Sequence, residues 1–270
     1  KNKIMDEPKQ KFKIVTDTRA RVILPNTLTL IGVCIGLSSI NFALNQNFKL
    51  AIVAILFAAI IDGLDGRIAR LIKGTSKVGK ELDSLTDVIS FGVAPAFIMY
   101  FWILNSLGKI GWLLSLMHVV CVALRLARFN INTNSDSSWR DNFFEGVPSP
   151  AGGILVLSPL IYEISGLDIL TLNYQFITPI IFVLTSILLI SKIPTYSLKK
   201  IIVPRSSTVF LLFGIILLFG LLLIFTFKAL VIGCLIYILG IPASIIHYKK
   251  FKKIFANDNK YDEKEPEDVL

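Results

Sequence analysis

The sequence predicts an all-α protein that crosses a lipid bilayer several times. Three observations predict this class: an apolar composition, repeated apolar runs about as long as a membrane is thick, and basic residues at the ends of those runs. Of the 270 residues, 54% are hydrophobic and 17% are charged, which is too apolar for an ordinary soluble domain. The chain is therefore expected to be a polytopic integral membrane protein.

Eight segments are apolar and long enough to cross the hydrocarbon core, which takes about 20 residues in a helix. They cover residues 22–45, 48–71, 84–105, 108–128, 149–166, 174–192, 207–227 and 229–248. The residues before position 22 mix lysines with apolar side chains and are expected to be interfacial or disordered. The residues after position 248 are expected to form a solvated tail.

The basic residues predict how these spans are oriented. Of the 28 lysines and arginines, all but Lys49, Lys109 and Lys228 fall on one side of the eight predicted spans. Cytoplasmic segments carry the excess of basic residues, so both termini are expected in the cytoplasm. The formal net charge of +9 could indicate binding to nucleic acid. Basic residues at the ends of apolar runs instead favour contact with an anionic lipid surface.

The second predicted span contains acidic residues that an apolar span does not need. Asp62, Asp65, Gly66 and Ala69 fall at positions i, i+3, i+4 and i+7, so they share one face of a helix. Arg70 follows directly and is placed to meet a phosphate. Gly66 is expected to let a bulky ligand approach the backbone, and Ala69 keeps that face shallow.

A second acidic helix face opens the third predicted span. A spacing of four residues relates Gly79, Asp83 and Asp87. Like Gly66, Gly79 is expected to let a bulky ligand approach the backbone. The two spans are joined by a short basic loop, which makes them adjacent and antiparallel. Four carboxylates are therefore predicted to converge between two neighbouring helices.

Four carboxylates close together near hydrocarbon repel one another and are costly unless a cation compensates them. Two divalent cations with oxygen ligands, Mg²⁺ or Mn²⁺, provide that compensation and suit a substrate that carries phosphates. The alternative is that the carboxylates pair with Arg67, Arg70 and nearby lysines at the membrane surface.

The same residues form the pattern D-x-x-D-G-x-x-A-R-x(8)-G-x-x-x-D-x-x-x-D, by which the chain resembles the CDP-alcohol phosphotransferase family. The resemblance implies a core of six transmembrane helices, usually dimeric, with a site open to the cytoplasmic half of the bilayer. It also implies roles for the motif residues. Metal ligands would be Asp62, Asp65, Asp83 and Asp87, with Asp87 also the general base, and the CDP moiety would face Gly66, Ala69, Arg70 and Gly79.

Further strings resemble the bacterial and archaeal phosphatidylserine synthases within that family. They run from Asp83 to Ala96, from Arg125 to Asn130 and from Gly146 to Gly152. The string from Pro25 to Thr29 is also family-like, and its Asn26 is expected to reach the nucleotide. The resemblance covers residues 22 to 200 and implies CDP-diacylglycerol as donor and L-serine as acceptor.

A serine acceptor brings a carboxylate that a guanidinium can hold with two parallel hydrogen bonds. Arg128 and Asn130 are the candidates for this role, with Arg125 as a third. The alternative for both arginines is that they anchor a helix end at the lipid headgroups.

The predicted organisation is an N-terminal segment (1–21), the six-helix core (22–200), two additional transmembrane helices (201–248) and a cytoplasmic tail (249–270). The additional helices are expected to serve packing or assembly. Two other functions stay open. One is the same chemistry with glycerol 3-phosphate, an inositol phosphate or choline as acceptor. The other is divalent-cation transport, which the sequence disfavours because all four aspartates lie near one membrane face.

Overall fold

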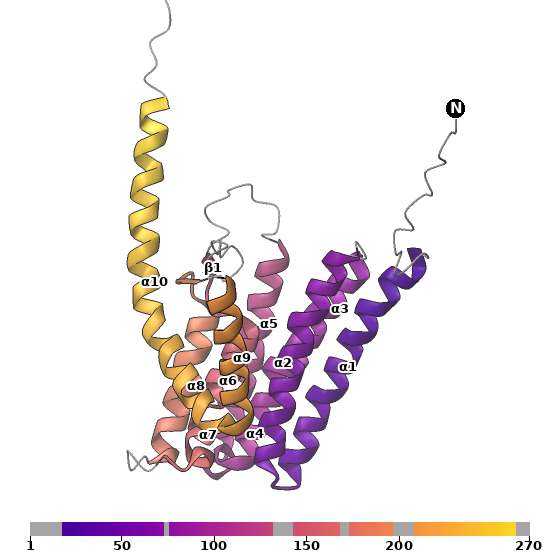
Figure 1. Ribbon diagram of the computed structural model, residues 1–270. Helices are drawn as coiled ribbons and strands as arrows, with labels where there is room; N and C mark the ends of the chain where they lie inside the picture. Colours follow the sequence, from indigo (N-terminus) through magenta and orange to yellow (C-terminus); the bar gives the residue numbers. More distant parts are fainter. Residues whose placement is uncertain (1–17, 73–75, 132–142, 168–172, 197–207, 263–270) are drawn as a thin grey trace, which may run out of the picture.

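The computed structural model describes residues 18–72, 76–131, 143–167, 173–196 and 208–262. Figure 1 shows the helices running side by side as a bundle. The elements are α1 (Thr18–Leu44), α2 (Phe48–Leu71), α3 (Lys77–Asp87), the π-helix η1 (Val88–Val93), α4 (Ala94–Trp102), the 3₁₀ helix η2 (Leu104–Leu107), α5 (Lys109–Ile131), β1 (Phe143–Glu145), α6 (Ser149–Val156), α7 (Ser158–Ser165), α8 (Tyr174–Ile190), β2 (Pro194–Tyr196), α9 (Thr208–Ile224) and α10 (Thr226–Asp262).

The helical membrane class predicted from the sequence is confirmed. Four described helical segments are long and apolar enough to cross a bilayer: Ile23–Leu44, Val78–Trp102, Lys109–Ile131 and Thr226–Lys249. A fifth, Tyr174–Ile190, is apolar but shorter. The remaining predicted spans coincide with helices, and their crossing of the membrane stays a prediction. In Figure 1, α1 begins and α10 ends at the same end of the bundle, which fits an even number of crossings.

The third predicted span begins earlier than expected and is not a uniform α-helix. It starts at Lys77 because Ser76 caps it, its Oγ accepting a hydrogen bond from Gly79 N at 2.9 Å. The π-helix η1 follows. Pro95 has no N–H to offer the carbonyl of Phe91 four residues before it, and the Nε2 of the buried His118 lies 3.4 Å from that oxygen. His118 thus compensates for a hydrogen bond that Pro95 cannot make.

Small residues pack η1 tightly between α1 and α6. A Cβ on Gly36 of α1 would lie 2.5 Å from Ser90 Oγ, and one on Gly153 of α6 would lie 3.1 Å from the Phe91 carbonyl oxygen. These close approaches hold the segment that follows Asp87 against its neighbours. Asp87 therefore sits at the junction of three elements.

The C-terminal helices are joined to the core through a strand pair that the sequence did not predict. β1 pairs antiparallel with β2, and Phe144 lies opposite Thr195. Ser244 of α10 donates to the Pro194 carbonyl at 2.7 Å. The apolar part of α10 ends at Lys249, close to the predicted end of the last span, but the helix itself continues to Asp262. No glycine or proline occurs between residues 249 and 262 to end it earlier.

Candidate active site

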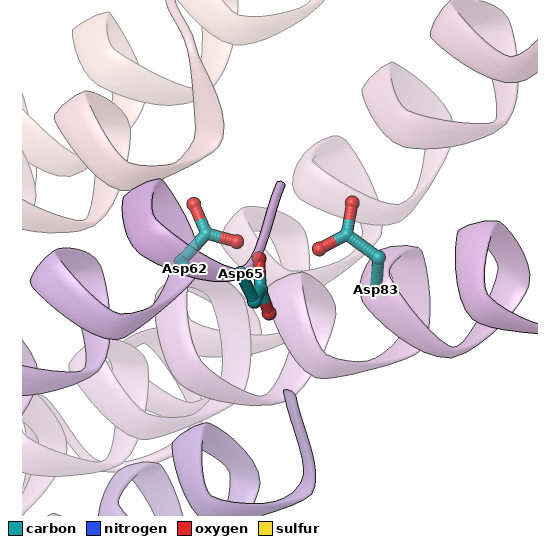
Figure 2. A group of neighbouring side chains, drawn as sticks. All are labelled: Asp62, Asp65 and Asp83. Carbon is teal, nitrogen blue, oxygen red and sulfur yellow. The ribbon is translucent and has the colours of Figure 1, made fainter. Parts of the chain in front are cut away.

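Three carboxylates lie together where α2 faces α3. Asp62 and Asp65 come from α2 and Asp83 from α3, and one oxygen of each lies within 4.8 Å of the others. Figure 2 shows Asp62 and Asp83 on either side of Asp65, each with one oxygen directed toward the space between them. Arg70 and Lys80 line the same cavity as these three groups. The alternative in which the carboxylates pair with neighbouring basic residues stays a prediction.

The spacing of these oxygens fits a divalent cation. Mg²⁺ binds its oxygen ligands at about 2.1 Å, so ligands on opposite sides of the ion lie about 4 Å apart. Small side-chain rotations would bring the three groups to that separation. A hard cation is also the partner that clustered, largely desolvated carboxylates require.

Thr29 of α1 orients one of the three carboxylates. Its hydroxyl is buried and donates to Asp65 Oδ2 at 2.7 Å. Asp65 is itself only 4% exposed, so this hydrogen bond fixes the direction of a side chain that has little room to turn. Thr29 was not among the residues singled out from the sequence, although it lies four residues after Pro25 in the family-like string from Pro25 to Thr29.

Asp87 belongs to a second polar group, in which hydrogen bonds link three buried side chains from three helices. Ser149, at the start of α6, donates to Asp87 Oδ2 at 2.7 Å. Arg125 of α5 donates from Nη1 to the Ser149 hydroxyl at 3.1 Å. Each of the three is less than a tenth exposed. We call this group the Asp87–Ser149–Arg125 chain.

Two polar atoms of this chain remain without a hydrogen bond. Asp87 Oδ1 and Arg125 Nε are both buried, and neither finds a partner among the described residues. Unsatisfied buried polar atoms are costly. Their presence beside a cavity indicates places where a bound polar molecule can supply the missing partners.

One cavity of about 610 Å³ joins the carboxylate cluster to the Asp87–Ser149–Arg125 chain. Residues of α1, α2, α3, α5 and α6 line it. Nearly all the residues singled out from the sequence contribute: Asn26, Asp62, Asp65, Gly66, Ala69, Arg70, Gly79, Asp83, Asp87, Arg125 and Asn130. The lining also contains residues that the sequence analysis did not select, chiefly Thr29, Lys80, Ser84, Phe129 and Ser149.

The two motif glycines differ in what they allow. A Cβ on Gly66 would meet no atom within 4 Å, so this glycine faces open cavity, as expected for a surface that a ligand approaches. A Cβ on Gly79 would lie 2.7 Å from Asn26 Oδ1. Gly79 therefore makes room for Asn26 of α1. Arg70 folds back, and its Nε donates to the Gly66 carbonyl at 3.0 Å.

Of the three residues predicted for the acceptor site, Arg125 and Asn130 line the cavity and Arg128 does not. Arg128 donates from Nη1 to the Ile190 carbonyl at 2.6 Å and from Nη2 to the Ser191 carbonyl at 3.1 Å. It ties α5 to the C-terminal end of α8, where carbonyls lack helical partners. Asn130 lines the cavity and donates to Ser84 Oγ at 2.9 Å. Of the two arginines, Arg125 lines the cavity and Arg128 does not, and the identity of the acceptor-site guanidinium stays a prediction.

Comparison with known proteins agrees with this geometry. Residues 22–239 match the model of a family described as CDP-alcohol phosphatidyltransferase. The chain is 41% identical over 185 residues to a protein of Mycobacterium leprae, 38% over 192 residues to one of Mycobacterium tuberculosis H37Rv and 38% over 179 residues to one of Helicobacter pylori 26695. Each of these is named CDP-diacylglycerol--serine O-phosphatidyltransferase.

The matches cover most but not all of each protein. They take in 67%, 70% and 66% of this chain, respectively, and 61%, 66% and 74% of the relatives' own lengths. The chain thus spans somewhat less than two thirds of the two mycobacterial relatives that it matches.

Proposed function

Because the chain belongs to the CDP-alcohol phosphatidyltransferase family, we propose that it transfers the phosphatidyl group of CDP-diacylglycerol to the hydroxyl of L-serine, giving phosphatidylserine and CMP. The observation that carries this proposal is a cavity lined both by the carboxylate cluster and by the Asp87–Ser149–Arg125 chain beside it. The part at the cluster is suited to cations and a pyrophosphate. The adjoining part holds an unpaired oxygen of Asp87 and the buried guanidinium of Arg125.

The part at the cluster is assigned to the pyrophosphate and nucleotide of CDP-diacylglycerol. Asp62, Asp65 and Asp83 would hold two divalent cations, Mg²⁺ or Mn²⁺, and Asp87, next to Asp62, would complete the ligand set. When bound, such ions neutralise the charge on the pyrophosphate as its P–O bond breaks. The nucleotide would lie along the cavity wall formed by Asn26, Gly66, Ala69, Arg70 and Gly79.

Asp87 is the proposed general base. Its Oδ2 is held by Ser149, and its Oδ1 is free to accept a proton. Transfer of the serine hydroxyl proton to Oδ1 leaves the serine oxygen to attack the lipid-linked β-phosphorus. The bond between that phosphorus and the bridging oxygen breaks, and CMP leaves with the electron pair.

Arg125 is the proposed partner of the serine carboxylate. Its guanidinium lies near Asp87 and is buried in the same part of the cavity, so an amino acid held there would present its hydroxyl to the base. A carboxylate also offers the acceptor oxygens that Arg125 Nε and its Nη groups lack. Asn130 is a second polar group on this wall.

The proposed setting is the inner membrane of the cell, with both termini and the cavity on the cytoplasmic side. Support comes from the basic residues gathered on that side of the spans and from α1 beginning and α10 ending at one end of the bundle (Figure 1). By its resemblance to the family, the chain is also proposed to act as a homodimer.

Product analysis on the purified chain in lipid nanodiscs tests the proposal. CDP-diacylglycerol is supplied with labelled serine, glycerol 3-phosphate, inositol phosphate or choline, and CMP and the lipid product are measured with and without a chelator. We expect labelled phosphatidylserine with serine alone and no product after chelation. Product with another acceptor only would overturn the serine assignment. Metal uptake into proteoliposomes without CMP release would indicate the transporter instead.

A further inference from the structure

One face of α5 runs along the segment of chain that follows the proposed base. His118, Val122 and Arg125 fall at positions i, i+4 and i+7, so they lie on one side of that helix. All three side chains are buried. Arg125 reaches Asp87 through Ser149, by hydrogen bonds of 3.1 and 2.7 Å. The face of α5 that reaches the base therefore continues about one and two turns further along the bundle.

Two contacts join this face to η1, which begins directly after the proposed base. A Cβ on Gly92 would lie 3.3 Å from the Val122 Cβ, so α5 and η1 are packed tightly here. One turn away, the Nε2 of His118 lies 3.4 Å from the Phe91 carbonyl oxygen. The other side of η1 is not needed to hold this histidine, because its ring also meets the Phe182 ring of α8 at 5.6 Å between centroids.

The π form of η1 determines the side of the helix on which Asp87 lies. A π-turn closes over one more residue than an α-turn, and one residue corresponds to about 100° of rotation about the axis of an α-helix. If residues 88–93 wound as an α-helix instead, α3 would be turned by about that angle relative to α4. Asp87 would then no longer point toward Ser149.

The carbonyl of Phe91 is the place where the π form depends on another helix. Pro95 lies four residues later and has no N–H to give to that carbonyl. Phe91 and His118 are both fully buried, in helical segments long and apolar enough to cross a bilayer, where no water can replace a missing donor. In the tautomer with its hydrogen on Nε2, His118 satisfies the carbonyl in its present position.

We propose that His118 is a positioning residue for Asp87. By donating from Nε2 to the Phe91 carbonyl, it keeps η1 in the π form and so keeps the base opposite Ser149. His118 does not line the catalytic cavity, so its influence on the reaction passes through η1. The inference rests on the proposed function, because it takes Asp87 as the general base.

His118→Phe tests this, because it removes the donor and keeps an aromatic ring against Phe182. We expect kcat to fall about tenfold, the effect of leaving one buried polar group unpaired, while the KM values for serine and CDP-diacylglycerol stay close to wild type. His118→Gln should recover most of kcat, because its amide nitrogen also donates. Ser115→Ala is the matched control and should keep wild-type kinetics. Ser115 is also buried on α5, but its hydroxyl bonds to the Gly111 carbonyl of the same helix.

A second change separates positioning from stability. In the His118→Phe background, Pro95→Ala provides an N–H that can bond to the Phe91 carbonyl as in an ordinary α-helix. Tm should then return toward the wild-type value while kcat stays low, because the α-turn that satisfies the carbonyl moves Asp87.

Recovery of kcat together with Tm in the double variant would overturn the inference in favour of a purely structural role. An unaltered kcat in His118→Phe, with a wild type that makes phosphatidylserine, would overturn the inference alone. Absence of phosphatidylserine from the wild type would overturn the proposed function, and this inference with it.

Discussion

Ser149 donates a hydrogen bond of 2.7 Å to Asp87 Oδ2 and so joins the start of α6 to the end of α3. Sixty-two residues separate the two in the sequence. The contact gives the two oxygens of Asp87 different roles, since one is held and the other is free. The proposed base is therefore already oriented toward the cavity before a substrate binds.

Asp87→Asn should abolish turnover while CDP-diacylglycerol still binds. The amide oxygen can accept the hydrogen bond from Ser149, but the amide nitrogen cannot take the proton of the acceptor hydroxyl. We expect kcat to fall by about 10²–10⁴-fold, the usual contribution of a general base. CMP release measured beside donor binding on the same preparation checks this. Near-normal kcat would remove Asp87 from the role of base.

Ser149→Ala should reduce kcat less than the loss of the base itself. The change leaves Asp87 Oδ2 and Arg125 Nη1 unpaired but keeps both side chains in the cavity wall. Each lost hydrogen bond to a charged group is worth about 1.5–3 kcal/mol, so we expect a fall in kcat of about 10–100-fold and a lower Tm. Ser38→Ala is a control, because that hydroxyl is exposed and bonds only to the Cys34 carbonyl in its own helix. Wild-type kinetics in Ser149→Ala would show that the chain does not orient Asp87.

Thr29→Val should weaken metal dependence without removing a ligand. Valine matches the shape of threonine but cannot donate to Asp65, whose carboxylate then loses its orienting bond. Loss of such a supporting contact typically costs about 10–100-fold in metal affinity. The Mg²⁺ or Mn²⁺ concentration for half-maximal activity should rise by that factor. Asp62→Ala and Asp65→Ala should instead lose metal and donor binding together, and activity that survives a chelator would contradict the metal site altogether.

Gly66→Ala should weaken donor binding and leave the fold intact. The added methyl meets no protein atom within 4 Å, so Tm should stay at the wild-type value or rise, because alanine favours a helix by about 1 kcal/mol over glycine. The methyl would occupy cavity that we assign to CDP, so the KM for CDP-diacylglycerol should rise several-fold. Gly63→Ala is the matched control, since its Cβ also meets nothing and it does not line the cavity. Equal behaviour of the two variants would argue against a nucleotide beside Gly66.

The sequence predicted the site better where one helix face carries it than where several helices meet. Asp62, Asp65, Asp83 and Asp87 were found because helical spacing alone aligns them on two neighbouring faces. Thr29 and Ser149 were missed, because their importance depends on α1 and α6 packing beside those faces. The choice between Arg125 and Arg128 could not be made for the same reason: they are three positions apart on α5, and only the presence of α6 and α8 decides what each one meets.

In the fold too, the sequence predicted local features but not those that depend on contacts between distant segments. Each of the eight apolar runs overlaps one or more helices among the described residues, because length and hydrophobicity are local properties. The π-helix η1 depends on Pro95, on His118 from another helix and on the close packing of Gly36 and Gly153. The strand pair depends on residues some fifty positions apart that meet at Thr195 and Gly146. Neither feature has a signal within a short window of sequence.

In acceptor recognition the two arginines of α5 should behave differently. Arg125→Lys keeps the charge but loses the planar donor geometry, so the KM for serine should rise about tenfold or more, as expected for a charge-assisted hydrogen bond. The KM for CDP-diacylglycerol should change little. Arg128→Lys should leave the KM for serine unchanged and lower Tm, because Arg128 bonds to the Ile190 and Ser191 carbonyls. Serine amide, which has no carboxylate, should discriminate poorly between wild type and Arg125→Lys. A raised KM for serine in Arg128→Lys alone would return the acceptor site to Arg128 and contradict the assignment made from the cavity.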